Sequence, residues 1–365
     1  MLMFDHGQSP FLDVMLSEAP AFSPPGMLRS GELQTLLGNL PPVQWLVRRR
    51  AAQLLARAQA WLLDCGAGVR LQGFLSVARR PEEPGRKRIA ILLHGWEGSA
   101  DSVYVISLGA ELLGRGFDVL RLNLRDHGES HHLNREIFHS CRLEEVVGAT
   151  RAVAERFPGA GIFLSGFSLG GNFMLRVAAD AGAPDSLVGV VAVSPVLDPT
   201  ATLDALERGL FLYRRYFVRR WSRSLRYKRQ AWPDLPDFEP ILRTKNLRAM
   251  TAGLVRDYTH FENLKAYLDG YAITGSRLAT LRCPATLLAA EDDPMIPAAD
   301  LARLAPSPRL TIVRTRYGGH CGFADRLNGP SFADRLVVAE FERFDREARR
   351  ATATDGASAS TETTA

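Results

Sequence analysis

Several features that mark other classes of protein are scarce or missing in this chain of 365 residues. Its four cysteines, Cys65, Cys141, Cys283 and Cys321, are far apart and form no Cys-x-x-Cys pair, which excludes a disulfide scaffold and disfavours a zinc ribbon or thioredoxin-like site. No apolar run approaches the roughly 20 residues that span a bilayer. The net charge is only +5, which a chain of this length reaches without binding nucleic acid. No internal repeat is present, so solenoids and propellers are excluded as well.

The composition is that of a globular protein, with 46% hydrophobic and 23% charged residues. At roughly 150 residues per domain, the length allows two domains or one large domain with an insertion. Residues 1–20 contain Asp5, His6, Asp13 and Glu18 and no basic residues leading into an apolar run. This pattern is unlike a secretory signal, and we therefore expect a cytoplasmic protein.

Short, almost fully apolar runs alternate with helix-period segments from residue 89 onward. The runs are Ile89–Leu93, Val119–Leu124, Ile162–Leu164, Leu187–Val193, Ala285–Ala290 and Leu310–Val313. Strands buried on both faces have this composition, and their alternation with helices predicts parallel pairing in an α/β fold with a doubly wound sheet. Successive runs lie about 30 residues apart, as in βαβ units, except for one gap of about 97 residues.

This spacing predicts the domain organisation. Residues 86–199 and 278–348 form the α/β core, and residues 200–277 form a helical cap inserted into it. Residues 1–85 form an N-terminal extension, with a helix over about 43–62 and an alternating strand over about 69–77 that joins the sheet. Residues 349–365 form a disordered tail, because residues 351–365 contain no apolar side chain larger than alanine.

Gly166-Phe167-Ser168-Leu169-Gly170 is the only Gly-x-Ser-x-Gly motif in the chain. A buried-strand run precedes it and a helix pattern follows it, which is the setting that a nucleophile elbow requires. The sharp turn strains the serine backbone and needs glycine where a Cβ would collide with neighbouring backbone. Ser168 is therefore the predicted nucleophile, at the carboxyl edge of the sheet.

A serine hydroxyl needs a base, and the base needs a carboxylate that orients it. In this architecture the chain order is serine, acid, histidine, each after its own strand. Glu291-Asp292-Asp293-Pro294 follows the run that ends at Ala290, and Gly319-His320-Cys321-Gly322 follows the next run. We predict His320 as the base and Asp293 as its partner, with Asp292 as the alternative acid.

The oxyanion formed during acyl attack needs two N–H donors. One is predicted to be the backbone N–H of Leu169, at the N-terminus of a helix. The other is expected from the loop His94-Gly95-Trp96-Glu97-Gly98, most simply the N–H of Trp96. We interpret His94 as a residue that shapes this loop rather than as a catalytic one.

The chain resembles the α/β-hydrolase superfamily over about residues 88–348. The resemblance is carried by His94-Gly95, the glycine-flanked Ser168, Asp293 and His320. Trp96-Glu97-Gly98-Ser99 and Phe138-His139-Ser140 resemble the branch of the bacterial YheT and the eukaryotic ABHD1/ABHD3-type proteins. The resemblance implies esterase-like or phospholipase-like serine hydrolysis without a cofactor. The chain departs from that branch at Arg125-Asp126-His127-Gly128-Glu129-Ser130, in place of an Arg-Gly-Cys-Gly type loop, and we expect no membrane anchor before the domain.

Three alternatives stay open at this stage. The same acyl-enzyme supports acyl transfer to an alcohol, and the fold could also serve a catalytically silent binding protein, although the complete triad disfavours this. The loop cluster of Asp126, His127, Glu129, His131, His132 and His139 contains ligand types that suit zinc or iron. Ligands crowded into one loop lack the separated pairs that set a metal geometry, so we predict no metal.

The predicted cap holds the main charge feature of the chain. Residues 208–229 contain nine basic residues and no acid, with Leu210, Tyr213, Phe217, Trp221 and Leu225 spaced along one helical face. We favour a lid helix whose apolar stripe packs on the domain and whose arginines face water. The alternative is peripheral contact with an anionic membrane. Nucleic-acid binding is not expected, because no nucleic-acid-binding motif accompanies this charge.

Overall fold

The computed structural model describes residues 22–79 and 86–361, with the backbone alone beyond residue 352. Eight strands form one sheet in the order β1-β2-β4-β3-β5-β6-β7-β8. They are β1 (Gln59–Asp64), β2 (Arg70–Ser76), β3 (Arg88–Leu93), β4 (Asp118–Leu122), β5 (Gly161–Phe167), β6 (Leu187–Val193), β7 (Ala285–Ala290) and β8 (Leu310–Thr315). Strands β3 to β8 are parallel, whereas β2 is antiparallel to both β1 and β4. Each predicted apolar run overlaps one parallel strand, so the predicted sheet is confirmed.

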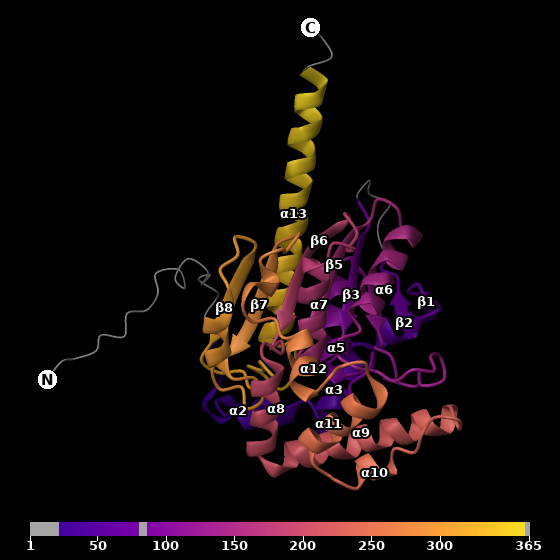
Figure 1. Cartoon of the computed structure of the whole chain (residues 1–365). Coiled ribbons are helices and arrows are strands. Elements are labelled where there is room, and N and C mark those ends of the chain that lie inside the picture. The colour runs from indigo at the N-terminus through magenta and orange to yellow at the C-terminus, as the bar shows by residue number, and fades with distance from the viewer. Residues whose placement is uncertain (1–21, 80–85, 362–365) are drawn as a thin grey trace, which may run out of the picture.

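Helices flank this sheet and cover one end of it (Figure 1). Those of the N-terminal segment are η1 (Gly26–Leu28), α2 (Gly31–Leu37), α3 (Pro41–Arg50) and α4 (Ala52–Ala56). Those beside the sheet are α5 (Val103–Gly114), α6 (Leu143–Arg156), α7 (Leu169–Ala179) and α13 (Phe332–Thr361), with η3 (Ala298–Arg303) between β7 and β8. Between β6 and β7 lie α8 (Pro199–Arg208), α9 (Phe211–Ala231), α10 (Glu239–Leu242), α11 (Leu247–Tyr258), α12 (Leu264–Tyr271) and η2 (Ser276–Leu278).

The apolar residues of the central strands are buried on both faces of the sheet. Along β3, Ile89 and Ile91 belong to the core cluster that includes α6 and α7, whereas Ala90 and Leu92 belong to the cluster that includes α5 and α13. All four are completely inaccessible to solvent. This burial explains why the strands are continuous apolar runs rather than alternating ones.

The helix expected over about 43–62 is shorter than predicted. Helices α3 and α4 end at Ala56, and residues 59–64 form β1, paired with β2 from Gln59↔Leu75 to Asp64↔Arg70. The pairing is closed by a turn in which Gly66, Ala67 and Gly68 all have positive φ. Leu63 is completely buried and Leu62 is 49% exposed, which is the alternation of a strand. The helix-period interpretation failed because tertiary pairing overrode the local pattern.

Between β6 and β7, where a helical cap over residues 200–277 is predicted, the chain is mainly helical. Helices α8 to α12 lie beyond one end of the sheet, and α2 and α3 lie at the same end (Figure 1). We call the segment from α8 to α12 the cap. It packs into the same apolar cluster as α6 and α7, so its position relative to the sheet is set by core contacts rather than by linkers.

The tail prediction is wrong for most of residues 349–365, because α13 continues as far as Thr361 and its last turns project beyond the sheet (Figure 1). The physical reason is that these residues extend a helix already begun at Phe332, and adding residues to an existing helix costs less free energy than starting a new one. Residues 362–365 lie outside the described residues, as do residues 1–20, on which the expectation about a secretory signal rests. No helix in the described part of the chain combines the length and the apolarity needed to cross a membrane.

Candidate active site

Ser168 lies in the turn between β5 and α7 and has a strained backbone, with φ 54° and ψ −120°. Its N–H donates to the carbonyl of Val193 on the neighbouring strand (2.9 Å), and its own carbonyl accepts from Asn172 in α7 (3.0 Å). Strand, turn and helix therefore follow one another as the motif predicts. These bonds hold the serine in a conformation that non-glycine residues rarely adopt.

The glycines of the motif are required by close backbone contacts. A Cβ on Gly166 would lie 2.3 Å from the carbonyl of Gly170, and a Cβ on Gly170 would lie 2.4 Å from the carbonyl oxygen of His94. A Cβ on Gly95 would lie 3.2 Å from the Cβ of Ser168. The loop after β3 therefore packs directly against the turn that carries the serine.

His320 and Asp293 come from the loops after β8 and β7. The Nδ1 of His320 and the Oδ2 of Asp293 are 2.9 Å apart, and the two side chains are 11% and 2% exposed. The other carboxylate oxygen, Oδ1, accepts from the N–H groups of Met295 (2.8 Å) and Ile296 (2.9 Å). Burial disfavours the charged imidazole, but the Asp293 carboxylate and the neighbouring Cys321 together outweigh it, so the pKa of His320 is raised well above 6.5.

Asp292 has a different partner from Asp293. Its Oδ1 accepts from the N–H of Gly319 (2.8 Å), the residue before His320. Of the two candidate acids, only Asp293 is hydrogen-bonded to the imidazole. Asp292 instead holds the backbone of the loop that carries the histidine.

The N-terminal segment also holds the His320 loop, which the sequence did not predict. The hydroxyl of Thr35 in α2 accepts from the N–H of His320 (2.8 Å), and the buried Gln34 side chain both donates to the carbonyl of Ala324 and accepts from its N–H, each at 2.8 Å. A Cβ on Gly322 would lie 2.4 Å from the carbonyl oxygen of Gln34. No local motif marks such long-range contacts. The run of glycines at 318, 319 and 322 was the one available signal of a close backbone approach.

The loop after β3 is held from inside the fold. His94 Nε2 accepts from the N–H of Leu124 (3.2 Å), which leaves Nδ1 protonated to donate to the carbonyl of Gly95 (2.7 Å). Burial lowers the pKa of His94 to about 4, so the ring is neutral near pH 7. The N–H of Gly95 donates to the Tyr104 hydroxyl (3.1 Å). These bonds support the interpretation of His94 as a structural residue.

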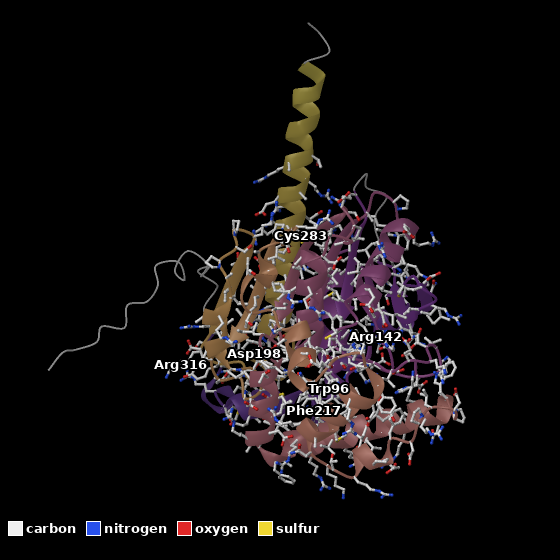
Figure 2. The ribbon with its side chains drawn as sticks, in the orientation of Figure 1. Trp96, Arg142, Asp198, Phe217, Cys283 and Arg316 are labelled. Atoms are coloured by element: carbon white, nitrogen blue, oxygen red, sulfur yellow. The ribbon has the colours of Figure 1, made fainter. Side chains whose placement is uncertain are left out.

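The same loop is held from outside by α9 of the cap. The ring of Trp96 stacks on Phe217, with centroids 5.1 Å and planes 10° apart, and meets Trp221 edge to face at 5.2 Å. Figure 2 labels Trp96 and Phe217 together where the cap meets the core. Arg220 donates to the carbonyl of Glu97 (2.7 Å). Within the described residues, the backbone N–H groups of Trp96 and Leu169 have no hydrogen-bond acceptor.

A cavity of about 830 Å³ joins these elements. Ser168, Leu169, Trp96 and His320 all line it. Its apolar walls include Leu203, Leu206, Phe217, Leu254, Leu268 and Met295, most of them from the cap. The cavity is therefore large enough, and apolar enough, to hold a small molecule with an apolar chain.

The apolar stripe of the cap helix is buried only in part. Tyr213, Trp221 and Leu225 in α9 are buried and Phe217 is partly buried, whereas Leu210, just before the helix, is 46% exposed. The expectation that Leu210 belongs to the buried face is therefore wrong. The residue precedes the first turn of α9, where the chain leaves the helical stripe.

The polar loop after β4 is built from buried ion pairs. Arg125 binds Glu145 (2.7 Å), and Lys228 of α9 binds Asp126 (2.8 Å) and the carbonyl of Glu136 (3.0 Å). Lys228, one of the nine basic residues of the segment 208–229, is not on the water-facing side of the helix with the arginines, because it is only 1% exposed. Across the residues that the structure describes, no group of three or more His, Cys, Asp or Glu side chains is placed to hold a metal ion.

Comparison with curated proteins finds relatives of low identity. The chain is 24% identical to the mouse phospholipase ABHD3 over 65% of the chain, and 24% identical to the putative esterase YheT of Escherichia coli over 68% of the chain. It is 22% identical to a Saccharomyces cerevisiae medium-chain fatty acid ethyl ester synthase/esterase over 70% of the chain. The matched region spans 58% of the mouse protein, 74% of the bacterial one and 62% of the yeast one.

Solved structures share the fold. An esterase of Pyrococcus furiosus superposes with a TM-score of 0.52 at 15% identity, covering 79% of this chain and 90% of the esterase. A bacterial membrane phospholipase A superposes with a TM-score of 0.50 at 17% identity, covering 86% of this chain and 94% of that one. Residues 91–327 match the family described as the alpha/beta hydrolase fold. With this match over more than half of its length, the chain belongs to the alpha/beta hydrolase fold family.

Proposed function

We propose that this protein hydrolyses carboxylic esters through Ser168, His320 and Asp293 and an acyl-enzyme intermediate. The observation that carries the proposal is that Ser168, on its strained turn, lines the same cavity as His320, whose Nδ1 is bonded to Asp293. The names of the relatives, which include a phospholipase and an esterase, support an ester or lipid as substrate.

Each residue has one role in this reaction. His320 takes the proton from the Ser168 hydroxyl through Nε2, because Nδ1 is held by Asp293. The serine oxygen bonds to the ester carbonyl carbon, and the N–H groups of Trp96 and Leu169 stabilise the oxyanion. The alcohol then leaves with the proton from His320. Water, deprotonated by His320, attacks the acyl-serine and releases the acid.

The test is covalent labelling with a fluorophosphonate, together with hydrolysis of 4-nitrophenyl esters of increasing chain length. The wild type should react with both, and Ser168→Ala should react with neither. Ser165→Ala is the matched control, because Ser165 is a buried serine in β5, the strand that leads into the turn at Ser168. This variant should behave like the wild type. Labelling of Ser168→Ala would remove Ser168 as nucleophile. A wild type that neither labels nor turns over would favour a silent binding protein.

Acyl transfer is the second candidate, favoured by the yeast relative named as both synthase and esterase. The acyl-enzyme is the same, and an alcohol takes the place of water. Product analysis with and without added ethanol separates the two: transfer predicts the ethyl ester as the main product, and hydrolysis predicts the free acid at every ethanol concentration.

A further inference from the structure

The cavity beside Ser168 carries an excess of positive charge. Six arginines and two aspartates line it: Arg48, Arg50, Arg215, Arg219, Arg220, Arg326, Asp101 and Asp334. Both aspartates already have ion-pair or hydrogen-bond partners within the protein. Asp101 pairs with Arg121 (2.7 Å), and the buried Asp334 accepts from the Ser107 hydroxyl (2.8 Å) and from the N–H of Ser331 (2.9 Å). Burial also raises the pKa of Asp334.

The six arginines that line the cavity fall into two groups. Three of them have partners in the protein: Arg50 donates to Ser107, Arg220 donates to the carbonyl of Glu97, and Arg326 pairs with Asp325. Arg48, Arg215 and Arg219, in contrast, are exposed and have no carboxylate within ion-pairing distance among the described residues. Their charges are therefore available to a ligand.

These three side chains approach the cavity from two elements. Arg215 and Arg219 are four residues apart in α9 and so lie on one side of that helix, and Arg48 belongs to α3 of the N-terminal segment. All three line the cavity that also contains Ser168. Other basic residues of α9 are used differently: Arg214 pairs with Glu207, Arg226 with Glu239, and Lys228 with Asp126.

We propose that Arg48, Arg215 and Arg219 bind an anionic group, a phosphate or a carboxylate, on the alcohol side of the ester substrate. The acyl chain then lies against the apolar walls formed by the cap. Guanidinium groups suit this role because they bind planar or tetrahedral oxyanions through paired N–H donors. This proposal rests on the proposed ester hydrolysis and narrows it to anionic esters.

The kinetic test compares two soluble substrates with the same acyl chain, hexanoylglycerol and hexanoylglycerol phosphate. The wild type should have the higher kcat/KM for the phosphate ester, and this preference should fall as salt is raised from about 0.05 M to about 0.5 M. The triple variant R48Q/R215Q/R219Q should lose about 10-fold or more in kcat/KM for the phosphate ester. Its kcat/KM for the neutral ester should stay within about 2-fold of wild type.

The matched control is R223Q/R226Q/R229Q, which makes the same total change in net charge, with all three arginines taken from α9 and none of them lining the cavity. It should keep the wild-type preference. Equal losses in the two triple variants, or equal losses on both substrates, would overturn the proposal.

Two further measurements do not depend on catalysis. They show whether the three arginines bind a soluble anion or a lipid surface. Calorimetric titration with hexyl phosphate needs no turnover: the wild type should bind it and the R48Q/R215Q/R219Q variant should bind it at least about 10-fold more weakly. Co-sedimentation with phosphatidylglycerol vesicles tests a lipid surface. If the triple variant loses only vesicle binding and keeps its preference for the soluble phosphate ester, the arginines face a membrane and the substrate-site proposal is wrong.

Discussion

The hydroxyl of Thr35 accepts a hydrogen bond from the backbone N–H of His320, 285 residues further along the chain, at 2.8 Å. The same hydroxyl donates to the carbonyl of Gly31 (2.7 Å), so it is fixed on both sides. The histidine loop is therefore held by α2, which lies outside residues 91–327 that match the family.

The first prediction concerns this bond. Thr35→Val keeps the shape of the side chain but leaves the N–H of His320 without its acceptor, which costs about 1 to 3 kcal/mol when the group is buried. We expect kcat to fall about 5- to 20-fold, with KM nearly unchanged, because the base shifts while the substrate walls do not. Thr35→Ser restores the acceptor and should recover most of the activity. Identical losses for valine and serine would contradict a positioning role.

The second prediction concerns the cap and the loop after β3. Phe217→Ala removes the ring that stacks on Trp96, a contact worth about 0.5 to 1.5 kcal/mol beyond its area. Since the Trp96 N–H is proposed to bind the oxyanion, kcat on a short ester should fall about 3- to 10-fold. Phe211→Ala, at a residue of the same helix that is 59% exposed, is the control and should change little. A rise in KM alone would mean that Phe217 only contacts substrate.

The third prediction separates the two aspartates. Asp293→Asn should reduce kcat by about 10⁴, the size of the effect seen when a serine protease loses this carboxylate, because the imidazole then takes the wrong tautomer. Asp292→Asn should cost far less, because an amide oxygen can still accept from the N–H of Gly319. Steady-state kinetics of both variants decide the matter, and a reversed order would move the acid to Asp292.

The fourth prediction is a pH dependence. His320 acts as a base only when neutral, and Asp293 together with Cys321 raises its pKa well above 6.5, so kcat/KM should increase with pH through a limb that lies above pH 6.5. Removing the carboxylate in Asp293→Asn destabilises the imidazolium and should move this limb to lower pH. Profiles measured from about pH 5 to about pH 10 test both statements. An unmoved limb in the variant would assign it to another group.

The fifth prediction concerns the buried pair of Lys228 and Asp126. Lys228→Met leaves the Asp126 carboxylate buried without its cation and should lower the free energy of unfolding by about 3 to 5 kcal/mol. Adding Asp126→Asn should recover part of this loss. Urea unfolding of the single and double variants gives the coupling energy. If Asp126→Asn lowers the free energy of unfolding of Lys228→Met by as much as it lowers that of the wild type, the two residues are not coupled.

Much of the core could be predicted from the sequence because its signals are local. A strand buried on both faces must be apolar throughout, and the parallel strands β3 to β8 were recognisable from short runs alone. A sharp turn between strand and helix needs glycines, which singled out Ser168. The order of Ser168, Asp293 and His320 after successive strands then suggested one site.

What only the tertiary structure decided depends on contacts between residues far apart in the chain. The 43–62 segment has a helical pattern up to its end, yet residues 59–64 form a strand because β2 offers a pairing edge and the turn at Gly66–Gly68 closes the hairpin. In the sequence, Lys228 is not distinguishable from the other basic residues of α9. In the fold it is buried, because its ammonium group donates hydrogen bonds to Asp126 and to two backbone carbonyls. Thr35 and Gln34 carry no motif at all. Hydrogen bonding between distant segments leaves no periodicity in a sequence, so the support of His320 became visible only in the fold.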